Sequence, residues 1–186
     1  MRPRMAAASP LLLMLVFVAA GCAGAPARGP GGGSTTVIVV RHAERATDDP
    51  ADPGLSAAGR ARAQALREAV SGAGVTAVYA TQYRRTRDTG APIAAERGIE
   101  VAVRPIDSSN ADTHADDLAR EIATRHPGGT VVVVGHSNTV PELVAALGGG
   151  EVEPLPESEY DRMYVLVVGR SGAVRRIAAT FGAPTD

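Results

Sequence analysis

Short runs of β-branched and apolar residues alternate along this chain with longer segments whose apolar residues recur at helical spacing. Residues 35–40 (TTVIVV) and 130–134 are almost continuously apolar, which is typical of strands buried on both faces of a parallel sheet. Ser56 precedes an Ala- and Arg-rich segment and is a good N-cap for a helix. The pattern predicts strands at 35–40, 75–80, 99–106 and 130–134, helices at 56–70, 84–97, 114–125 and 140–147, and a hairpin of 163–168 with 173–180.

Predicted strands and helices alternate for most of the chain, and this pattern decides the fold class. It favours an α/β domain with a doubly wound, mostly parallel sheet and helices on both faces. In such sheets ligands bind beyond the carboxyl ends of the strands. We therefore expect functional residues in the loops that directly follow the strands.

The amino-terminal pattern differs from the rest of the chain. Arg2 and Arg4 precede an apolar run, Leu11 to Ala20, which is too short to span a bilayer and has the length of a signal-peptide core. Small residues then lead into Cys22, the only cysteine, as in a bacterial lipobox. The segment after it is rich in Gly, Pro and Ala and is typical of a flexible tether.

These features predict three regions: a lipoprotein signal peptide at 1–21, a lipidated Cys22 with its linker at 22–34, and one folded domain at 35–186. An ordinary secretory peptide with a chance cysteine is the alternative to the lipid anchor. The predicted location is the cell envelope, with the lipid anchor either on the periplasmic side of an outer membrane or on the extracellular face of the membrane.

Composition narrows the function further. The chain has 186 residues, a formal net charge of −1 and 45% hydrophobic residues, enough for one domain with its own core. The balanced charge gives no reason to expect a nucleic-acid partner. All 19 basic residues are Arg, whose planar fork suits phosphate. The four His show no metal-ligand spacing, so no metal and no other cofactor is predicted.

Three polar segments each follow directly after a predicted strand. They are residues 41–44 (RHAE), residues 81–89 (TQYRRTRDT) and residues 135–138 (GHSN). The predicted fold places all three at the carboxyl edge of the sheet. Arginine forks there would bind phosphate oxygens, and a neutral imidazole could attack phosphorus and carry the phosphoryl group.

The same segments carry a family resemblance. The chain resembles the histidine phosphatase superfamily, also called phosphoglycerate mutase-like, in four motifs taken in order. The matching positions are Arg41, His42, Ala43 and Glu44; Leu55, Ser56, Gly59 and Ala63; Thr81 (usually Ser), Arg85 and Thr89; and Gly135 with His136.

The resemblance implies a role for each matched position. His42 would be the phosphorylated nucleophile, Arg41 and Arg85 would bind the phosphoryl oxygens, and His136 would complete the pocket. Glu44 is expected to orient an Arg or a His. The neighbours of Arg85 on the same helix are expected to face solvent.

The proton donor to the leaving alcohol stays open between two carboxyl groups. Asp107 follows the third predicted strand, where many members have an acidic residue, and Glu142 lies on the helix after His136. The position directly after the second His, acidic in another branch, is Ser137 here.

We therefore predict an exported, membrane-anchored, metal-independent phosphomonoester hydrolase that acts through a phosphohistidine on a small phosphorylated substrate. We expect it to be a monomer. Two alternatives remain: an envelope lipoprotein that binds phosphate or a phospho-ligand with weak or no turnover, and, against the predicted export, a phosphoglycerate-type mutase.

Overall fold

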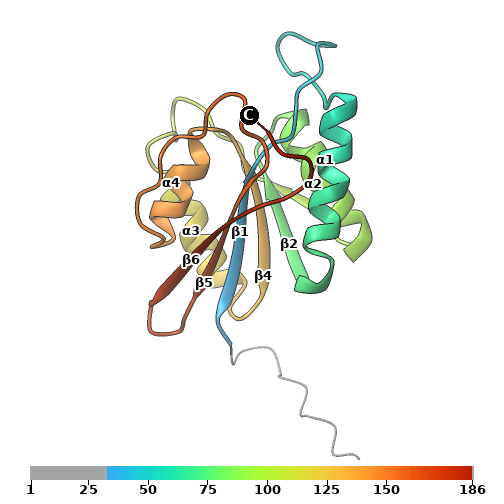
Figure 1. Ribbon diagram of the computed structural model, residues 1–186. Helices are drawn as coiled ribbons and strands as arrows, with labels where there is room; N and C mark the ends of the chain where they lie inside the picture. Colours follow the sequence, from blue (N-terminus) through green and yellow to red (C-terminus); the bar gives the residue numbers. More distant parts are fainter. Residues whose placement is uncertain (1–32, 186) are drawn as a thin grey trace, which may run out of the picture.

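The computed structural model describes residues 33–185 (Figure 1). The elements are β1 (Thr35–Arg41), α1 (Ala57–Ala69), a 3₁₀ turn (Ser71–Ala73), β2 (Val75–Ala80), α2 (Arg84–Arg97), β3 (Val101–Val103), α3 (His114–Arg125), β4 (Thr130–Gly135), α4 (Thr139–Ala146), β5 (Arg162–Val168) and β6 (Val174–Thr180). The predicted signal peptide and Cys22 lie outside the described residues, and β1 begins at the predicted start of the domain.

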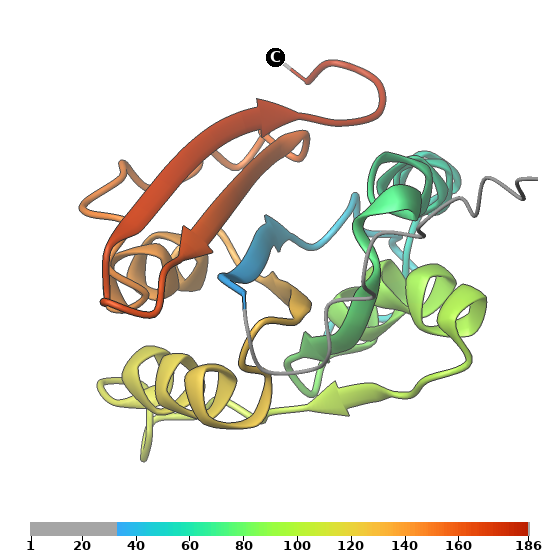
Figure 2. The same cartoon turned by 90° about the horizontal axis from the view of Figure 1, so that it is seen from below.

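The six strands form one mixed sheet in the order β3-β2-β4-β1-β5-β6. Strands β1 to β4 pair in parallel, and β5 runs antiparallel between β1 and β6. Helices α1 and α2 cover one face, and α3 and α4 cover the other (Figures 1 and 2). The predicted doubly wound α/β fold is confirmed.

The alternation of side chains in the central strands divides the core in two. Val37 and Val39 of β1 pack with α3 and α4, whereas Ile38 and Val40 pack with α1 and α2. The valines of β4 alternate in the same way. Each face of these strands is therefore buried, which explains why their sequences are continuously apolar.

The predicted strand at 99–106 is wrong in length, because β3 covers only Val101–Val103. This strand lies at the edge of the sheet and pairs with β2 alone. Its last partner is Ala80, where β2 itself ends, and Pro105 has no N–H with which to continue a ladder. Within the part of the chain described here, no helix is long and apolar enough to cross a membrane.

Candidate active site

The register of three parallel strands brings the predicted site residues together. Val40 of β1 and Ala80 of β2 both pair with Val134 of β4, so the three strands end at one level. The backbone N–H of His42 then donates to the carbonyl of Gly135 at 2.9 Å. The loops after β1, β2 and β4 therefore meet over the carboxyl edge of the sheet.

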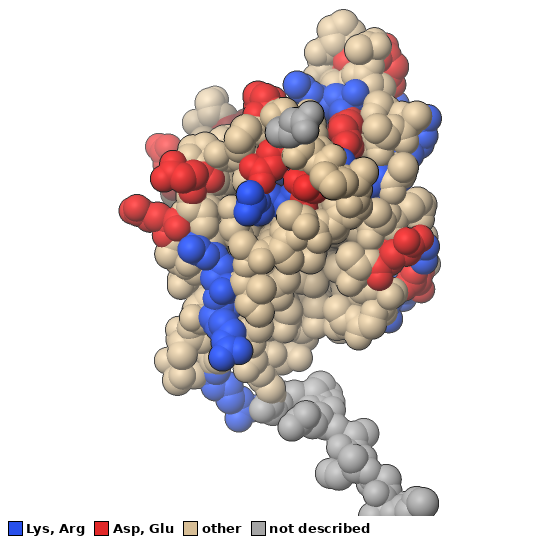
Figure 3. Space-filling model, viewed as in Figure 1, with Lys and Arg blue, Asp and Glu red and all other residues tan. Residues whose placement is uncertain are grey.

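A cavity of about 330 Å³ lies at this edge. Its lining residues come from the three predicted loops and from the segment between α4 and β5; they are Arg41, His42, Arg45, Tyr83, Arg85, Ile106, His136, Ser137, Asn138, Thr139 and Glu157. Figure 3 shows acidic and basic residues gathered around this upper end of the molecule, and below them a largely uncharged area beside a stripe of basic residues. All four residues expected to hold or attack phosphate line this one cavity.

His42 lies buried in the cavity, 3% exposed. Its Nδ1 is 2.8 Å from the carbonyl oxygen of Ala43, which can only accept, so Nδ1 carries the proton and Nε2 keeps its lone pair. Burial, together with the charges of His136, Arg41 and Arg85, lowers the pKa of His42 from 6.5 to about 3. The ring is therefore neutral and nucleophilic at neutral pH.

His136 is held by a chain of hydroxyl groups. The Thr86 hydroxyl donates to the carbonyl of Tyr83 at 2.8 Å, so it accepts from the Thr81 hydroxyl at 2.9 Å. The Thr81 hydroxyl in turn accepts from Nε2 of His136 at 3.0 Å. Burial, and then Arg85 and Arg41, lower the pKa of His136 to about 4. Its ring lies 5.4 Å from that of His42, centroid to centroid.

Arg41 is 2% exposed and is bound chiefly by the loop before β5. Its Nη1 donates to the carbonyls of Pro156, Glu157 and Glu159 at 2.7, 3.1 and 3.1 Å, and its Nη2 pairs with the Glu157 carboxylate at 2.9 Å. Its Nε is buried and has no partner among the described residues. A buried N–H without an acceptor costs about 1–3 kcal/mol, and a bound anion would remove that cost.

Arg85 lines the same cavity as Arg41 and also has a buried Nε atom. Its Nε is the other buried side-chain atom without a partner in the described part of the chain, and its guanidinium lies 4.3 Å from the centre of the Tyr83 ring. Burial and the nearby Arg45 lower the pKa of Arg85. Two orphaned guanidinium N–H groups beside a third arginine form a site that suits an oxyanion.

The geometry of helix α2 directs Arg84 and Arg87 away from the cavity that Arg85 lines, as expected. Arg84 is 43% exposed and lies 3.3 Å from Asp48, while Arg87 is exposed. Neither lines the cavity. Of the three arginines in this part of α2, only Arg85 has its side chain at the cavity.

Two motif residues that carry no charge position the loop after β1. The Thr89 hydroxyl accepts from the backbone N–H of Ala43 at 3.0 Å and donates to the carbonyl of Arg85 at 2.7 Å. A Cβ at Gly59 would lie 2.3 Å from the carbonyl oxygen of Glu44, so only glycine permits this approach of α1. These motif positions therefore fix the backbone that presents His42.

Glu44 pairs with an arginine outside the cavity. Its carboxylate accepts from Nε and Nη2 of Arg62, at 2.9 and 2.8 Å. The Nη1 of Arg62 donates to the carbonyls of Phe181 and Ala183. Glu44 thus links the loop after β1 to the carboxyl-terminal segment through α1.

The two predicted proton donors do not line the cavity. Asp107 is exposed, one residue beyond the lining residue Ile106, and accepts from the Ser109 hydroxyl and N–H, which lower its pKa. Glu142 is exposed on the first turn of α4, where partial desolvation of its carboxyl group and the nearby Asp112 raise its pKa. Their role as acid stays a prediction.

Sequence reasoning missed three charged or aromatic residues at the cavity: Arg45, Tyr83 and Glu157. Tyr83 lies within the second motif segment, between Thr81 and Arg85, so its position gave a signal. Glu157 lies in a loop far along the chain, and no spacing in the sequence indicates its contact with Arg41.

Comparison with known proteins finds a family model that matches part of this chain. Residues 37–106, which include His42 and Arg85, match the model of the histidine phosphatase superfamily (branch 1). Over these residues the chain is similar to that superfamily. A search of the curated proteins finds none that matches this sequence.

Solved histidine phosphatase structures share the fold. A mycobacterial glucosyl-3-phosphoglycerate phosphatase in complex with VO3 is 18% identical over 80% of this chain and 99% of its own, with a TM-score of 0.58. The protein histidine phosphatase SixA, complexed with tungstate, is 17% identical over 78% and 96%, with a TM-score of 0.57.

A phosphoserine phosphatase from Entamoeba histolytica, in complex with 3-phosphoglyceric acid, is 16% identical over 81% of this chain and 98% of its own, with a TM-score of 0.58. At these identities the likeness shows the fold. The match of residues 37–106 to the histidine phosphatase family model supports a phosphatase enzyme.

Proposed function

We propose that this protein is an exported, lipid-anchored phosphomonoester hydrolase that acts through a phosphohistidine formed at His42. The supporting observation is that one cavity holds a neutral, buried His42 and two arginines whose Nε atoms have no partner among the described residues. Such a site can bind the oxygens of a phosphoryl group while it presents a lone pair to the phosphorus.

In this mechanism the hydrogen bond from Nδ1 to the Ala43 carbonyl orients the ring of His42. Nε2 attacks phosphorus, the bond to the leaving oxygen breaks, and the alcohol departs with a proton. Arg41 and Arg85 stabilise the charge that develops on the phosphoryl oxygens. The negative charge of the bound phosphoryl group favours the protonated form of His136, whose Nδ1 then also donates to it. Water then hydrolyses the phosphohistidine and releases inorganic phosphate.

The relatives suggest the class of substrate. The structures with VO3 and tungstate hold oxyanions that resemble phosphate, and the named relatives act on small phosphorylated compounds or on a phosphorylated protein side chain. A cavity of about 330 Å³ accommodates a phosphoryl group with a small organic group attached. We therefore propose a small phosphomonoester as the substrate.

The test of this function is turnover by the purified domain. We expect hydrolysis of p-nitrophenyl phosphate and of small phosphomonoesters, unchanged by a chelator, and a loss of at least about 10⁴-fold in kcat for His42→Ala. Tight binding of inorganic phosphate without turnover by the wild type would instead indicate a binding protein.

Export and anchoring rest on the amino-terminal sequence alone. The signal-peptide pattern at residues 1–21 and the lipobox-like approach to Cys22 support them. Expression with Cys22→Ser should move the protein from the membrane fraction to the soluble fraction of the envelope. A variant that still sediments with membranes would contradict the anchor.

A further inference from the structure

The cavity contains one acidic side chain that the mechanism above does not use. Among the described residues that line it, Glu157 alone carries a carboxyl group. It comes from the loop between α4 and β5, which arches over the carboxyl edge of the sheet (Figure 1). We propose that Glu157 donates the proton to the leaving oxygen, an inference that rests on the proposed phosphatase function.

Three side chains fix the carboxyl group of Glu157 at the cavity. Its Oε2 lies 2.9 Å from Nη2 of Arg41 and 3.7 Å from Nη2 of Arg45, and its Oε1 accepts from the Ser137 hydroxyl at 3.2 Å. Arg41 also binds the backbone carbonyls on either side of it. The arginine expected to bind phosphate therefore also positions this carboxyl group.

The depths of His42 and Glu157 in the cavity indicate where the leaving group would point. His42 lies 3% exposed in the cavity, whereas the Glu157 side chain is 73% exposed at its rim. In an in-line displacement the leaving oxygen lies opposite the attacking nitrogen. A phosphoryl group attacked by His42 would thus point its leaving oxygen toward the rim, where Glu157 lies.

The charges around Glu157 change when a substrate binds. In the free protein Arg41 lowers the pKa of Glu157, with help from Ser137 and Arg45, and the group is ionised. A phosphate ester on Arg41 brings negative charge next to the carboxylate and offsets the arginine. A like charge at this distance favours the protonated acid, which is the form needed to donate.

The proton balance is then complete. Nε2 of His42 forms the bond to phosphorus, the P–O bond breaks, and the leaving oxygen takes the proton of Glu157 as the alcohol departs. The resulting carboxylate accepts a proton from the water that attacks the phosphohistidine, which restores the acid. Asp107 and Glu142 do not line the cavity, so Glu157 is better placed than either for both steps.

The experiment compares Glu157→Gln with wild type on two esters. p-Nitrophenyl phosphate releases a phenolate that needs no proton, whereas glycerol phosphate releases an alkoxide that does. For glycerol phosphate we expect kcat/KM to fall by about 10²–10⁴-fold, the usual contribution of a general acid. For p-nitrophenyl phosphate it should fall less than about tenfold, because kcat/KM covers only the steps up to departure of the first product.

Glu153→Gln is the matched control, since Glu153 is exposed in the same loop and does not line the cavity. Its kcat/KM should equal that of wild type for both esters. Binding of inorganic phosphate by Glu157→Gln should be at least as tight as in wild type, which shows that the cavity is intact.

Two other outcomes would overturn the inference in different ways. An equal loss of kcat/KM for both esters in Glu157→Gln would show that Glu157 is not the proton donor. So would a gain for both esters, as expected if the variant only removes a competing anion. Either result would leave the proposed phosphatase function unaffected. Absence of turnover of either ester by wild type would refute the proposed function, and the role of Glu157 with it.

Discussion

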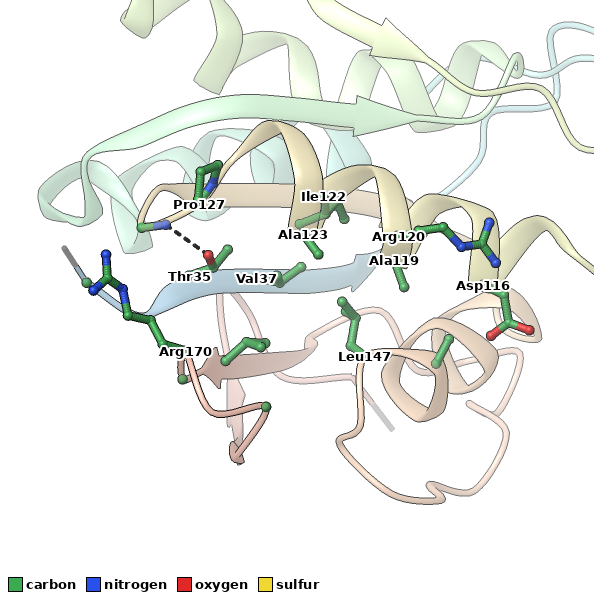
Figure 4. Close-up of a pocket in the computed structure, with 16 residues that line it drawn as sticks. Thr35, Val37, Asp116, Ala119, Arg120, Ile122, Ala123, Pro127, Leu147 and Arg170 are labelled. Carbon is green, nitrogen blue, oxygen red and sulfur yellow. Dashed lines mark hydrogen bonds between the residues drawn. The ribbon is translucent and has the colours of Figure 1, made fainter. Parts of the chain in front are cut away.

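The two ends of β1 open into cavities of opposite character. The cavity at the carboxyl end has a volume of about 330 Å³ and is lined by three arginines, two histidines and a glutamate. The groove at the amino end is larger, about 550 Å³, and its walls are mostly apolar side chains of β1, α3 and α4 (Figure 4). Between these two cavities, volume alone would favour the amino-end groove as the site of function.

The chemistry of the two cavities reverses that choice. At the amino end, Thr35 already accepts from the backbone N–H of Gly128 at 3.0 Å (Figure 4). Arg120 already pairs with Asp117 at 2.7 Å. At the carboxyl end, Arg41 and Arg85 each retain a buried N–H without a partner among the described residues. A site for an anion is recognised by such unpaired donors and not by its size.

The largest expected contrast is between one arginine from each cavity. Arg85→Ala should lower kcat/KM for p-nitrophenyl phosphate by about 10²–10³-fold, since it removes a donor to the phosphoryl oxygens. Arg120→Ala, in the amino-end groove, should change it less than about twofold. Similar losses in both variants would remove the functional difference between the two cavities.

A second contrast concerns two glycines. Gly59→Ala would place a Cβ 2.3 Å from the Glu44 carbonyl beside the carboxyl-end loops, whereas Gly72, near the amino end of β2, has no atom within 4 Å of its Cβ position. We expect Gly59→Ala to reduce the free energy of unfolding by about 1–3 kcal/mol. Gly72→Ala should leave it unchanged or raise it slightly. Urea denaturation measures both, and a tolerated Gly59→Ala would contradict the close packing at this end.

A third, smaller effect is a pH dependence of stability. The pKa of His42 is lowered in the folded protein to about 3, so below pH 6.5 the unfolded chain binds a proton that the folded state does not. Stability therefore falls as the pH drops from 6.5 toward the folded pKa. Between pH 7 and pH 5, wild type should lose about 1–2 kcal/mol more unfolding free energy than His42→Gln. Equal losses would mean that His42 is not buried in its neutral form.

The sequence predicts the carboxyl-end site well wherever a local pattern carries it. The continuously apolar runs place His42 and His136 directly after β1 and β4, and the motif register separates Arg85 from the exposed Arg84. The fold follows for the same reason, because each face of a central strand must meet a helix. These features depend on spacing along one segment of chain.

The features that were missed depend on loops that return from distant parts of the chain. The Glu157 carboxylate meets Arg41 across 116 positions, and Arg62 joins Glu44 to Phe181. No periodic pattern of apolar residues in the sequence indicates contacts between segments so far apart. The last residue of β3 is set by the point at which its partner strand β2 ends. The alternating pattern along residues 99–106 carries no information about that partner.

The most direct test of the account is to trap the covalent intermediate. Protein mixed with a radiolabelled phosphomonoester, denatured at alkaline pH and digested, should give one labelled phosphohistidine peptide that contains His42 and is absent from His42→Ala. Turnover without label at His42, or with label on another residue, would contradict the central claim that this cavity acts through His42.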